Sequence, residues 1–192
     1  MAKKETKPGA EIDADGLVVQ KYKSTVLVVL PRAEFGDESL RYARSSLYNV
    51  HVGTWSVSTE SKELIKGRHQ DEFLVDGPLA GASMEHYSGV VFAGGEGVHE
   101  LLDNADALRL AREATQQKKM IGAWGQATEI LARAGVLKGR RVTGDPGIES
   151  AVERAGGKYT GRQIEVDGAL VTSRDDAVGM RFGKALAALV GI

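Results

Sequence analysis

Three short apolar runs constrain the fold of this chain more than any other feature. They read Thr-Val-Leu-Val-Val-Leu at 25–30, Gly-Val-Val-Phe-Ala at 89–93 and Met-Ile-Gly-Ala-Trp at 120–124. Apolar runs of this length that are rich in β-branched residues are typical of strands covered on both faces. A sheet that is buried on both faces needs helices on each side, so we expect an α/β fold.

Segments with helical spacing alternate with these strands. Apolar residues recur at intervals of three and four residues in four segments: 37–47, 107–114, 127–134 and about 176–190. Asp37 is a plausible N-cap of the first helix, and Gly135 is a suitable glycine after the third. The alternation predicts a flavodoxin-like, doubly wound sheet that is mostly parallel, with helices on both faces.

Further strands are expected between and after these elements. We predict a second strand over about 49–57 and a small C-terminal hairpin of 163–166 and 170–172 around Asp167-Gly168. Residues 58–80 predict a hairpin excursion, with Asp76-Gly77-Pro78 as a turn.

The length of 192 residues fits one domain with a tail. Residues 1–22 are rich in lysine and glutamate and lack a periodicity that would bury a face, so we expect an N-terminal arm that is flexible or packs on a neighbouring subunit. Residues 23–192 form the expected α/β domain.

Composition excludes several classes of function. The net charge is −1, no apolar run approaches the roughly 18 to 20 residues that span a bilayer, and the N-terminus lacks the apolar stretch of a secretory signal. We therefore expect a cytoplasmic protein without nucleic-acid or membrane partners. The chain has no cysteine, which excludes disulfides, thiolate metal sites and cysteine nucleophiles.

Ligands of doubly wound sheets bind outside the carboxyl ends of the strands. The expected site therefore lies where the strands ending at Leu30, Ala93 and Trp124 meet. Glycines follow two of these ends, at Gly94-Gly95 and at Gly125.

Several segments in register resemble the ThiJ/PfpI superfamily, which has a class I glutamine-amidotransferase-like fold, and in particular its PfpI-like intracellular protease/amidase branch. The segments are Glu34-Phe-Gly-Asp37, Gly94-Gly95, Ala134-Gly-Val-Leu-Lys-Gly-Arg140, Thr143-Gly-Asp-Pro-Gly-Ile148, Val166-Asp-Gly168 and Val171-Thr-Ser-Arg174. The resemblance covers roughly residues 25–192. It implies self-association as a dimer or a larger homo-oligomer.

The chain departs from the family at all three polar positions of the site. The family carries Ala-Ile-Cys-His-Gly at its nucleophile elbow, and this chain reads Ala123-Trp-Gly-Gln-Ala127. Gly125 stands at the cysteine position and Gln126 at the histidine position. Gly36 replaces the glutamate of the family's Glu-Phe-Glu-Asp segment. A third possibility is that the cysteine was replaced by glycine through protein engineering. One such change would account for Gly125, but it would leave Gln126 and Gly36 unexplained.

The resemblance implies that the pocket frame is retained. Its elements are the elbow residues Trp124, Gly125, Gln126 and Ala127, an oxyanion-type loop at Gly94 and Gly95, and the first-strand loop at Gly36 and Asp37. Gly125 either enlarges a ligand pocket or serves only a strained turn. Trp124 either stacks on a ligand or, as we favour, lies in the core or a subunit interface.

Glu96, His99 and Glu34 are the candidate acid–base residues, although a Glu and a His after a glycine turn are more often solvated. Glu100 is the candidate acid that the resemblance implies for the site of an adjacent subunit. The remaining histidines show no spacing typical of a metal site, and no dinucleotide or phosphate-binding motif is complete, so we expect neither a metal nor a cofactor.

The leading hypothesis is a cysteine-free ThiJ/PfpI-like pseudoenzyme that binds a small polar metabolite or has a structural or stress-related role. The alternative is a non-covalent lyase, hydratase or glyoxalase-type enzyme that acts on a small carbonyl compound through Glu and His residues.

Overall fold

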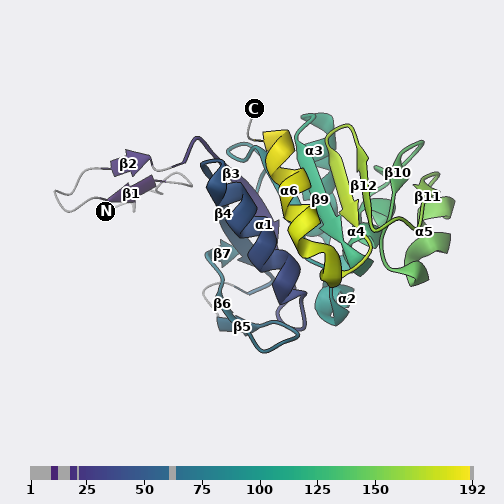
Figure 1. Cartoon of the computed structure of the whole chain (residues 1–192), viewed down its shortest axis with the longest axis horizontal. Helices are drawn as coiled ribbons and strands as arrows, with labels where there is room; N and C mark the ends of the chain where they lie inside the picture. The colour runs from purple at the N-terminus through teal and green to yellow at the C-terminus, as the bar shows by residue number, and fades with distance from the viewer. Residues whose placement is uncertain (1–9, 13–17, 21, 61–63, 191–192) are drawn as a thin grey trace.

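The computed structural model describes residues 10–12, 18–20, 22–60 and 64–190 (Figure 1). The strands are β1 (Ala10–Ile12), β2 (Val18–Gln20), β3 (Ser24–Val29), β4 (Val52–Ser58), β5 (Leu64–Lys66), β6 (Glu72–Leu74), β7 (Gly77–Pro78), β8 (Gly89–Phe92), β9 (Met120–Trp124), β10 (Arg141–Val142), β11 (Lys158–Tyr159), β12 (Ile164–Asp167) and β13 (Leu170–Ser173). The α-helices are α1 (Asp37–Asn49), α2 (His99–Leu102), α3 (Ala105–Gln116), α4 (Thr128–Arg133), α5 (Glu149–Arg154) and α6 (Gly179–Val190). Short 3₁₀ turns are η1 (Glu96–Val98), η2 (Gly125–Ala127), η3 (Pro146–Ile148) and η4 (Asp176–Val178).

The main sheet has seven strands in the order β12-β13-β9-β8-β3-β4-β7. Only β12 runs antiparallel to its neighbour, and the other pairings are parallel. Helices α1 and α6 lie side by side on one face, and α3 and α4 lie on the other (Figure 1). The predicted fold, with its C-terminal hairpin of β12 and β13, is therefore confirmed.

The position of strand β3 explains why apolar and polar residues do not alternate in its sequence. Leu27 and Val29 point into the core under α3 and α4, whereas Val26 and Val28 point into the core under α1 and α6. All four side chains are at most 2% exposed. Because successive side chains of a strand face opposite sides, a strand between two helical layers needs apolar residues at every position.

Local boundaries differ from the prediction at two places. The second strand begins at Val52 and not near residue 49, because α1 continues to Asn49 and the chain then turns through His51 with φ +60°. Gly77 and Pro78 were expected in a turn, but they form β7 and pair with Val57 and Ser58 of β4. The predicted hairpin excursion is present as the antiparallel pair β5 and β6.

The N-terminal arm is described only in part. Residues 10–12 and 18–20 form an antiparallel pair, β1 and β2, in a sheet of their own. The expectation that the arm is flexible or packs on a neighbouring subunit falls largely on residues 1–9, 13–17 and 21, which lie outside the described residues. Among the described helices, none is both long and apolar enough to cross a membrane.

Two glycines let α6 approach α1 closely. A Cβ on Gly183 would collide with the carbonyl oxygen of Tyr42, and a Cβ on Gly179 would lie 2.8 Å from the Cα of Ser39. The first turn of α6 is thereby held against the first turn of α1. This contact brings residues about 140 positions apart to the edge of the sheet where the candidate site lies.

Gly183→Ala tests this packing by the sign of its effect. At an open helix position the change from glycine to alanine stabilises by about 1 kcal/mol because alanine has the higher helix propensity. At Gly183 the added methyl group meets backbone atoms, so we expect a loss of about 1–3 kcal/mol in the free energy of unfolding. Urea denaturation measures it, with Lys184→Ala, at an exposed position of α6, as control. A stabilised Gly183→Ala protein would contradict the close approach.

Candidate functional site

The carboxyl ends of β3, β8, β9 and β13 lie at one edge of the sheet because these strands are parallel neighbours. The segments that follow them contain Gly36, Gly94, Gly125 and Asp176. The hairpin of β5 and β6 joins this edge through a hydrogen bond from the Glu34 N–H to the Lys66 carbonyl, 2.9 Å long. The edge therefore gathers segments from across the whole chain.

Gly125 forms a sharp elbow between β9 and α4. Its φ is +57°, in the left-handed region, and its residue surface is buried. Apart from its chain neighbours, the nearest described atom to a Cβ built there is the Arg174 carbonyl oxygen, 4.0 Å away. Backbone conformation therefore explains a glycine at this position, whereas packing does not, and a side chain would enter open space.

Gly94 and Gly95 lack the space for a side chain, and Gly95 in addition has a positive φ of +136°. A Cβ on Gly94 would collide with the carbonyl oxygen of Trp124, and a Cβ on Gly95 would collide with that of Glu34. Both positions thus hold three backbone segments together at the strand ends. Their predicted role as an oxyanion-type loop stays a prediction.

Trp124 lies in the core, as favoured from the sequence. Its side chain is 1% exposed and meets the Phe182 ring edge to face, with ring centroids 5.7 Å apart. Its Nε1 is buried and has no hydrogen-bond partner among the described residues. Gln126 Oε1 and Ser173 Oγ, which belong to the segments beside the elbow, are also buried without a partner in the described part of the chain.

The predicted N-cap role of Asp37 is wrong. The N-cap is Gly36, and the cap hydrogen bond comes from a distant residue, because Asp176 Oδ1 accepts the Ser39 N–H at 2.6 Å. A Cβ on Gly36 would lie 2.6 Å from this oxygen and 2.7 Å from Trp124 Nε1. Position 36 therefore has no room for a side chain while the Asp176 carboxylate occupies the space.

The Asp37 carboxylate turns instead to His69. Asp37 Oδ1 lies 2.7 Å from His69 Nδ1, and Oδ2 accepts the backbone N–H groups of His69 at 2.8 Å and Asp71 at 3.4 Å. Burial raises the pKa of Asp37, but the hydrogen bonds from His69 and Asp71 outweigh burial and hold that pKa below its ordinary value of 3.8.

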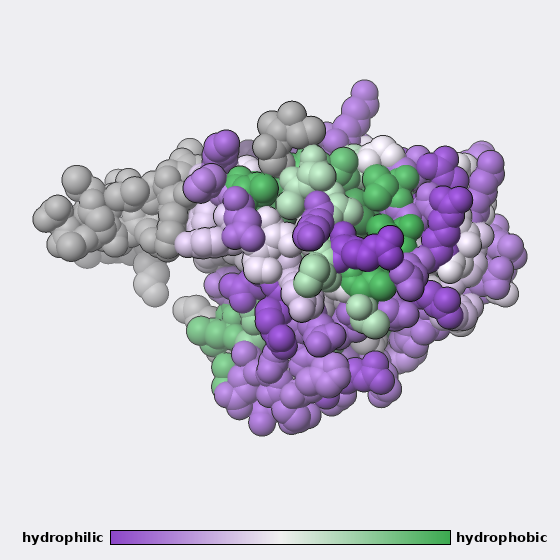
Figure 2. Space-filling view, in the orientation of Figure 1, coloured by the Kyte–Doolittle hydropathy of each residue, from purple (hydrophilic) through white to green (hydrophobic). Residues whose placement is uncertain are grey.

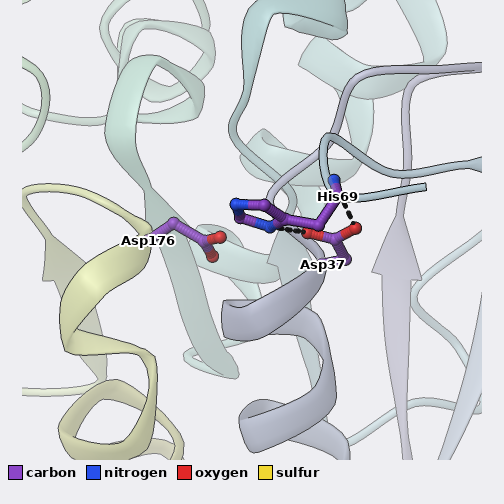
Figure 3. Close-up of side chains that lie close together, drawn as sticks. All are labelled: Asp37, His69 and Asp176. Atoms are coloured by element: carbon purple, nitrogen blue, oxygen red, sulfur yellow. Dashed lines mark hydrogen bonds and ion pairs between the residues drawn. The ribbon is translucent and has the colours of Figure 1, made fainter. Parts of the chain in front are cut away.

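Asp37, His69 and Asp176 together form a cluster that could hold a metal ion (Figure 3). One ligand atom from each side chain lies within 4.8 Å of the others. The cluster could not be found from the sequence, because its three members are 32 and 107 residues apart along the chain and carry no motif spacing. No local signal could have found Asp176.

The predicted acid–base candidates are exposed. Glu34 has a left-handed backbone with φ +54°, and Glu96 and His99 lie in η1 and at the start of α2. Glu100 accepts hydrogen bonds from the Arg32 N–H at 2.8 Å and from Thr59 Oγ1 at 3.2 Å. Exposure removes the shielding that would have supported a shared acid–base role for Glu96 and His99.

The Thr143-Gly-Asp-Pro-Gly-Ile148 segment packs against the elbow at Gly125. The Thr143 N–H donates to Thr172 Oγ1 at 2.8 Å, and Thr128 Oγ1 donates to the Thr143 carbonyl at 3.1 Å. A Cβ on Gly144 would lie 2.7 Å from the Gly125 carbonyl oxygen. The motif therefore has a structural role, because it ties α4, β13 and the elbow together.

A family model described as the DJ-1/PfpI family matches residues 24–189. The chain belongs to the DJ-1/PfpI family. A relative named Deglycase PfpI, from Pyrococcus furiosus, is 30% identical over 148 residues, which cover 77% of this chain and 89% of the relative. An uncharacterized protein from Methanocaldococcus jannaschii is 29% identical over 161 residues, which cover 82% of this chain and 78% of that protein.

Solved structures agree with this assignment. A ThiJ/PfpI domain protein from Brachyspira murdochii superposes with a TM-score of 0.83 at 22% identity, covering 88% of this chain and 97% of that one. Drosophila melanogaster DJ-1β superposes with a TM-score of 0.78 at 23% identity, covering 88% and 91%. These likenesses show the shared class I glutamine-amidotransferase-like fold. The chain is thus a member of this family that contains no cysteine.

Asp37→Asn tests the buried carboxylate through the pH dependence of stability. Because the pKa of Asp37 is lower in the folded than in the unfolded state, its carboxylate stabilises the fold above pH 3.8, and this contribution is lost as pH falls through the folded pKa. We expect Asp37→Asn to lose about 1.5–3 kcal/mol at pH 7 and progressively less below pH 3.8.

Urea denaturation between pH 7 and pH 3 in metal-free buffer measures this difference. Asp103→Asn is the matched control, since the Asp103 side chain is 83% exposed. A difference between Asp37→Asn and the parent that stayed constant over the whole pH range would contradict the lowered pKa.

Proposed function

We propose that this protein is a cysteine-free DJ-1/PfpI family member that binds a small polar metabolite without covalent chemistry at the Gly125 elbow. The observation that carries the proposal is the set of buried polar atoms beside the elbow, Trp124 Nε1, Gln126 Oε1 and Ser173 Oγ, which have no hydrogen-bond partner among the described residues. A buried polar group without a partner costs about 1–3 kcal/mol. A bound ligand with matching groups would recover that cost.

The chemistry of these atoms indicates the class of ligand. Trp124 Nε1 only donates, Gln126 Oε1 only accepts, and the Ser173 hydroxyl does both. A ligand that offers a carbonyl or carboxylate oxygen together with a hydroxyl group would match this set. Small hydroxy acids and oxo acids, the latter in part as hydrates, belong to this class.

The thiolate chemistry of a cysteine nucleophile has no place in the proposal. The Pyrococcus furiosus relative is named a deglycase, but the present chain contains no thiol at all. Gly125 forms a sharp elbow with φ +57°, and it has no side chain that could act as a nucleophile. The alternative of a Glu and His enzyme has lost support, because Glu34, Glu96 and His99 are exposed.

Trp124 provides a reporter for the proposed site. The chain has two tryptophans, so Trp55→Phe leaves Trp124 as the single tryptophan, which can be excited selectively over the tyrosines. We expect saturable fluorescence changes on titration with at least one of glycolate, lactate, glyoxylate and pyruvate. Gly125→Leu should abolish them by filling the open space, and Ser173→Ala should weaken binding by about 1–3 kcal/mol.

Gly135→Leu is the matched control for Gly125→Leu. Gly135 also has a positive φ, +76°, and open space around it, but it lies at the end of α4. Both variants place a leucine at a positive φ, and only Gly125→Leu should lose the ligand. Absence of a saturable change with all four compounds, or turnover of α-oxoaldehydes or a fluorogenic amide by the parent, would contradict the proposal.

Self-association as a homo-oligomer is part of the proposal. Leu64 and Leu74 are 57% and 62% exposed and lie opposite each other across the β5 and β6 hairpin. Figure 2 shows an apolar patch over this hairpin. A subunit contact that buries this apolar surface would be stabilised by its removal from water.

Light scattering after size exclusion tests the assembly. We expect the parent to be a dimer or larger and the double variant Leu64→Glu, Leu74→Glu to shift toward the monomer mass. Met180→Glu is the control, since Met180 is 49% exposed but lies on α6. A monomeric parent, or a double variant of unchanged mass, would argue against the hairpin as the contact.

A further inference from the structure

The strongest unexplained feature outside the elbow is the cluster of Asp37, His69 and Asp176. Its members come from the start of α1, from the β5 and β6 hairpin and from η4. Figure 3 shows the imidazole ring and the two carboxylates turned toward one another. The tertiary fold alone assembles them.

Each carboxylate of the cluster is held by backbone N–H groups through one oxygen only. Asp37 Oδ2 accepts from His69 and Asp71, which leaves Oδ1 beside His69 Nδ1. Asp176 Oδ1 accepts from Ser39, whereas its Oδ2 is buried and has no partner within the described ranges. Backbone donors that fix one oxygen and leave the other facing a shared point are the arrangement that orients metal ligands.

Two glycines make room for these carboxylates. A Cβ on Gly67 would lie 2.5 Å from Asp37 Oδ2, and a Cβ on Gly36 would lie 2.6 Å from Asp176 Oδ1. A helix cap alone requires only Oδ1 of Asp176. The glycine at 67, the histidine and the second oxygen of Asp176 are not accounted for by capping.

Trp124, whose Nε1 also borders the proposed metabolite site, lies beside the same cluster. Its side chain is 1% exposed, and its Nε1 and the Asp176 carboxylate both lie within 2.8 Å of the position where a Gly36 Cβ would stand. This N–H has no acceptor among the described residues. A donor that only donates, buried beside a carboxylate oxygen, fits an oxygen atom bound at the cluster.

We propose that Asp37, His69 and Asp176 bind a divalent first-row transition metal ion, such as Zn²⁺ or Mn²⁺. Two carboxylates supply a charge of −2 that neutralises the ion, and the imidazole disfavours Mg²⁺ and Ca²⁺, which prefer oxygen ligands. The N-terminus of α1 opposes a cation with roughly half a positive charge. The two carboxylates outweigh this charge, and Asp176 already accepts one of the helix N–H groups.

The geometry needs only side-chain adjustment to close on an ion. Ligand atoms about 2.1 Å from a tetrahedral ion lie about 3.4 Å apart, and those of the cluster lie within 4.8 Å of one another. The His69 side chain is 59% exposed and can rotate without displacing the core. Three protein ligands leave a further position at the ion for a solvent or ligand oxygen.

Calorimetric titration of the tag-free full chain, treated with EDTA, tests the site with the metal alone. We expect one Zn²⁺ per chain, weaker binding of Mn²⁺ in line with the usual affinity order, and no competition by Mg²⁺. His69→Ala and Asp176→Asn should each weaken Zn²⁺ binding by about 100-fold or more, because each removes a ligand atom or its charge.

Asp176→Asn separates metal binding from folding, since an asparagine Oδ1 still accepts the Ser39 N–H and preserves the cap. Circular dichroism verifies the fold of both variants, and His86→Ala, at an exposed histidine outside the cluster, is the control for adventitious binding. Absence of stoichiometric Zn²⁺ binding by the parent would overturn the proposal. Equal affinity in the parent, His69→Ala and Asp176→Asn proteins would overturn it as well.

The metal proposal goes beyond the proposed metabolite site. The two sites share Trp124 Nε1 as a neighbouring donor, but none of the three metal ligands is a group assigned to the metabolite. Gly125→Leu fills the elbow but leaves all three metal ligands in place, so this variant should keep the Zn²⁺ affinity of the parent. Loss of hydroxy-acid binding with retained Zn²⁺ binding, or the reverse, therefore distinguishes failure of one proposal from failure of the other.

Discussion

The parallel pairing of β3, β8, β9 and β13 is the constraint on which the rest of the structure depends. Parallel strands place all their carboxyl ends at one edge, and the connecting helices must then cover both faces. Every group considered for function follows one of these ends or packs against a segment that does. The close contact of α6 with α1 completes the edge, because it brings Asp176 to the first turn of α1.

The glycines at this edge fall into two classes with different meanings. Gly36, Gly67 and Gly94 leave no room for a Cβ, because carboxylate, indole or backbone atoms occupy the space. Gly125 has room but a left-handed backbone. Backbone conformation alone therefore accounts for the glycine at this elbow. Gly36, in contrast, is coupled to Asp176 and would not accept a glutamate without displacing it.

Prediction from the sequence succeeded where the pattern was local. The run at 25–30 predicted a strand covered on both faces, and the helices and the C-terminal hairpin followed from spacing and turn chemistry. Prediction failed at Asp37, whose acidic side chain at the start of a helix is typical of a cap. The residue that caps α1 is Asp176, 137 positions from its partner Ser39, and no spacing rule links the two.

The sequence by itself determined the family, the α/β class and the absence of a thiolate, because these depend on residue type, periodicity and order along the chain. Only the tertiary structure decided which polar groups meet. It left Glu96 and His99 exposed and brought Asp37, His69 and Asp176 together. The physical reason is that a side chain's partners depend on the approach of distant segments, here the packing of α6 on α1 and of the β5 and β6 hairpin on the first-strand loop.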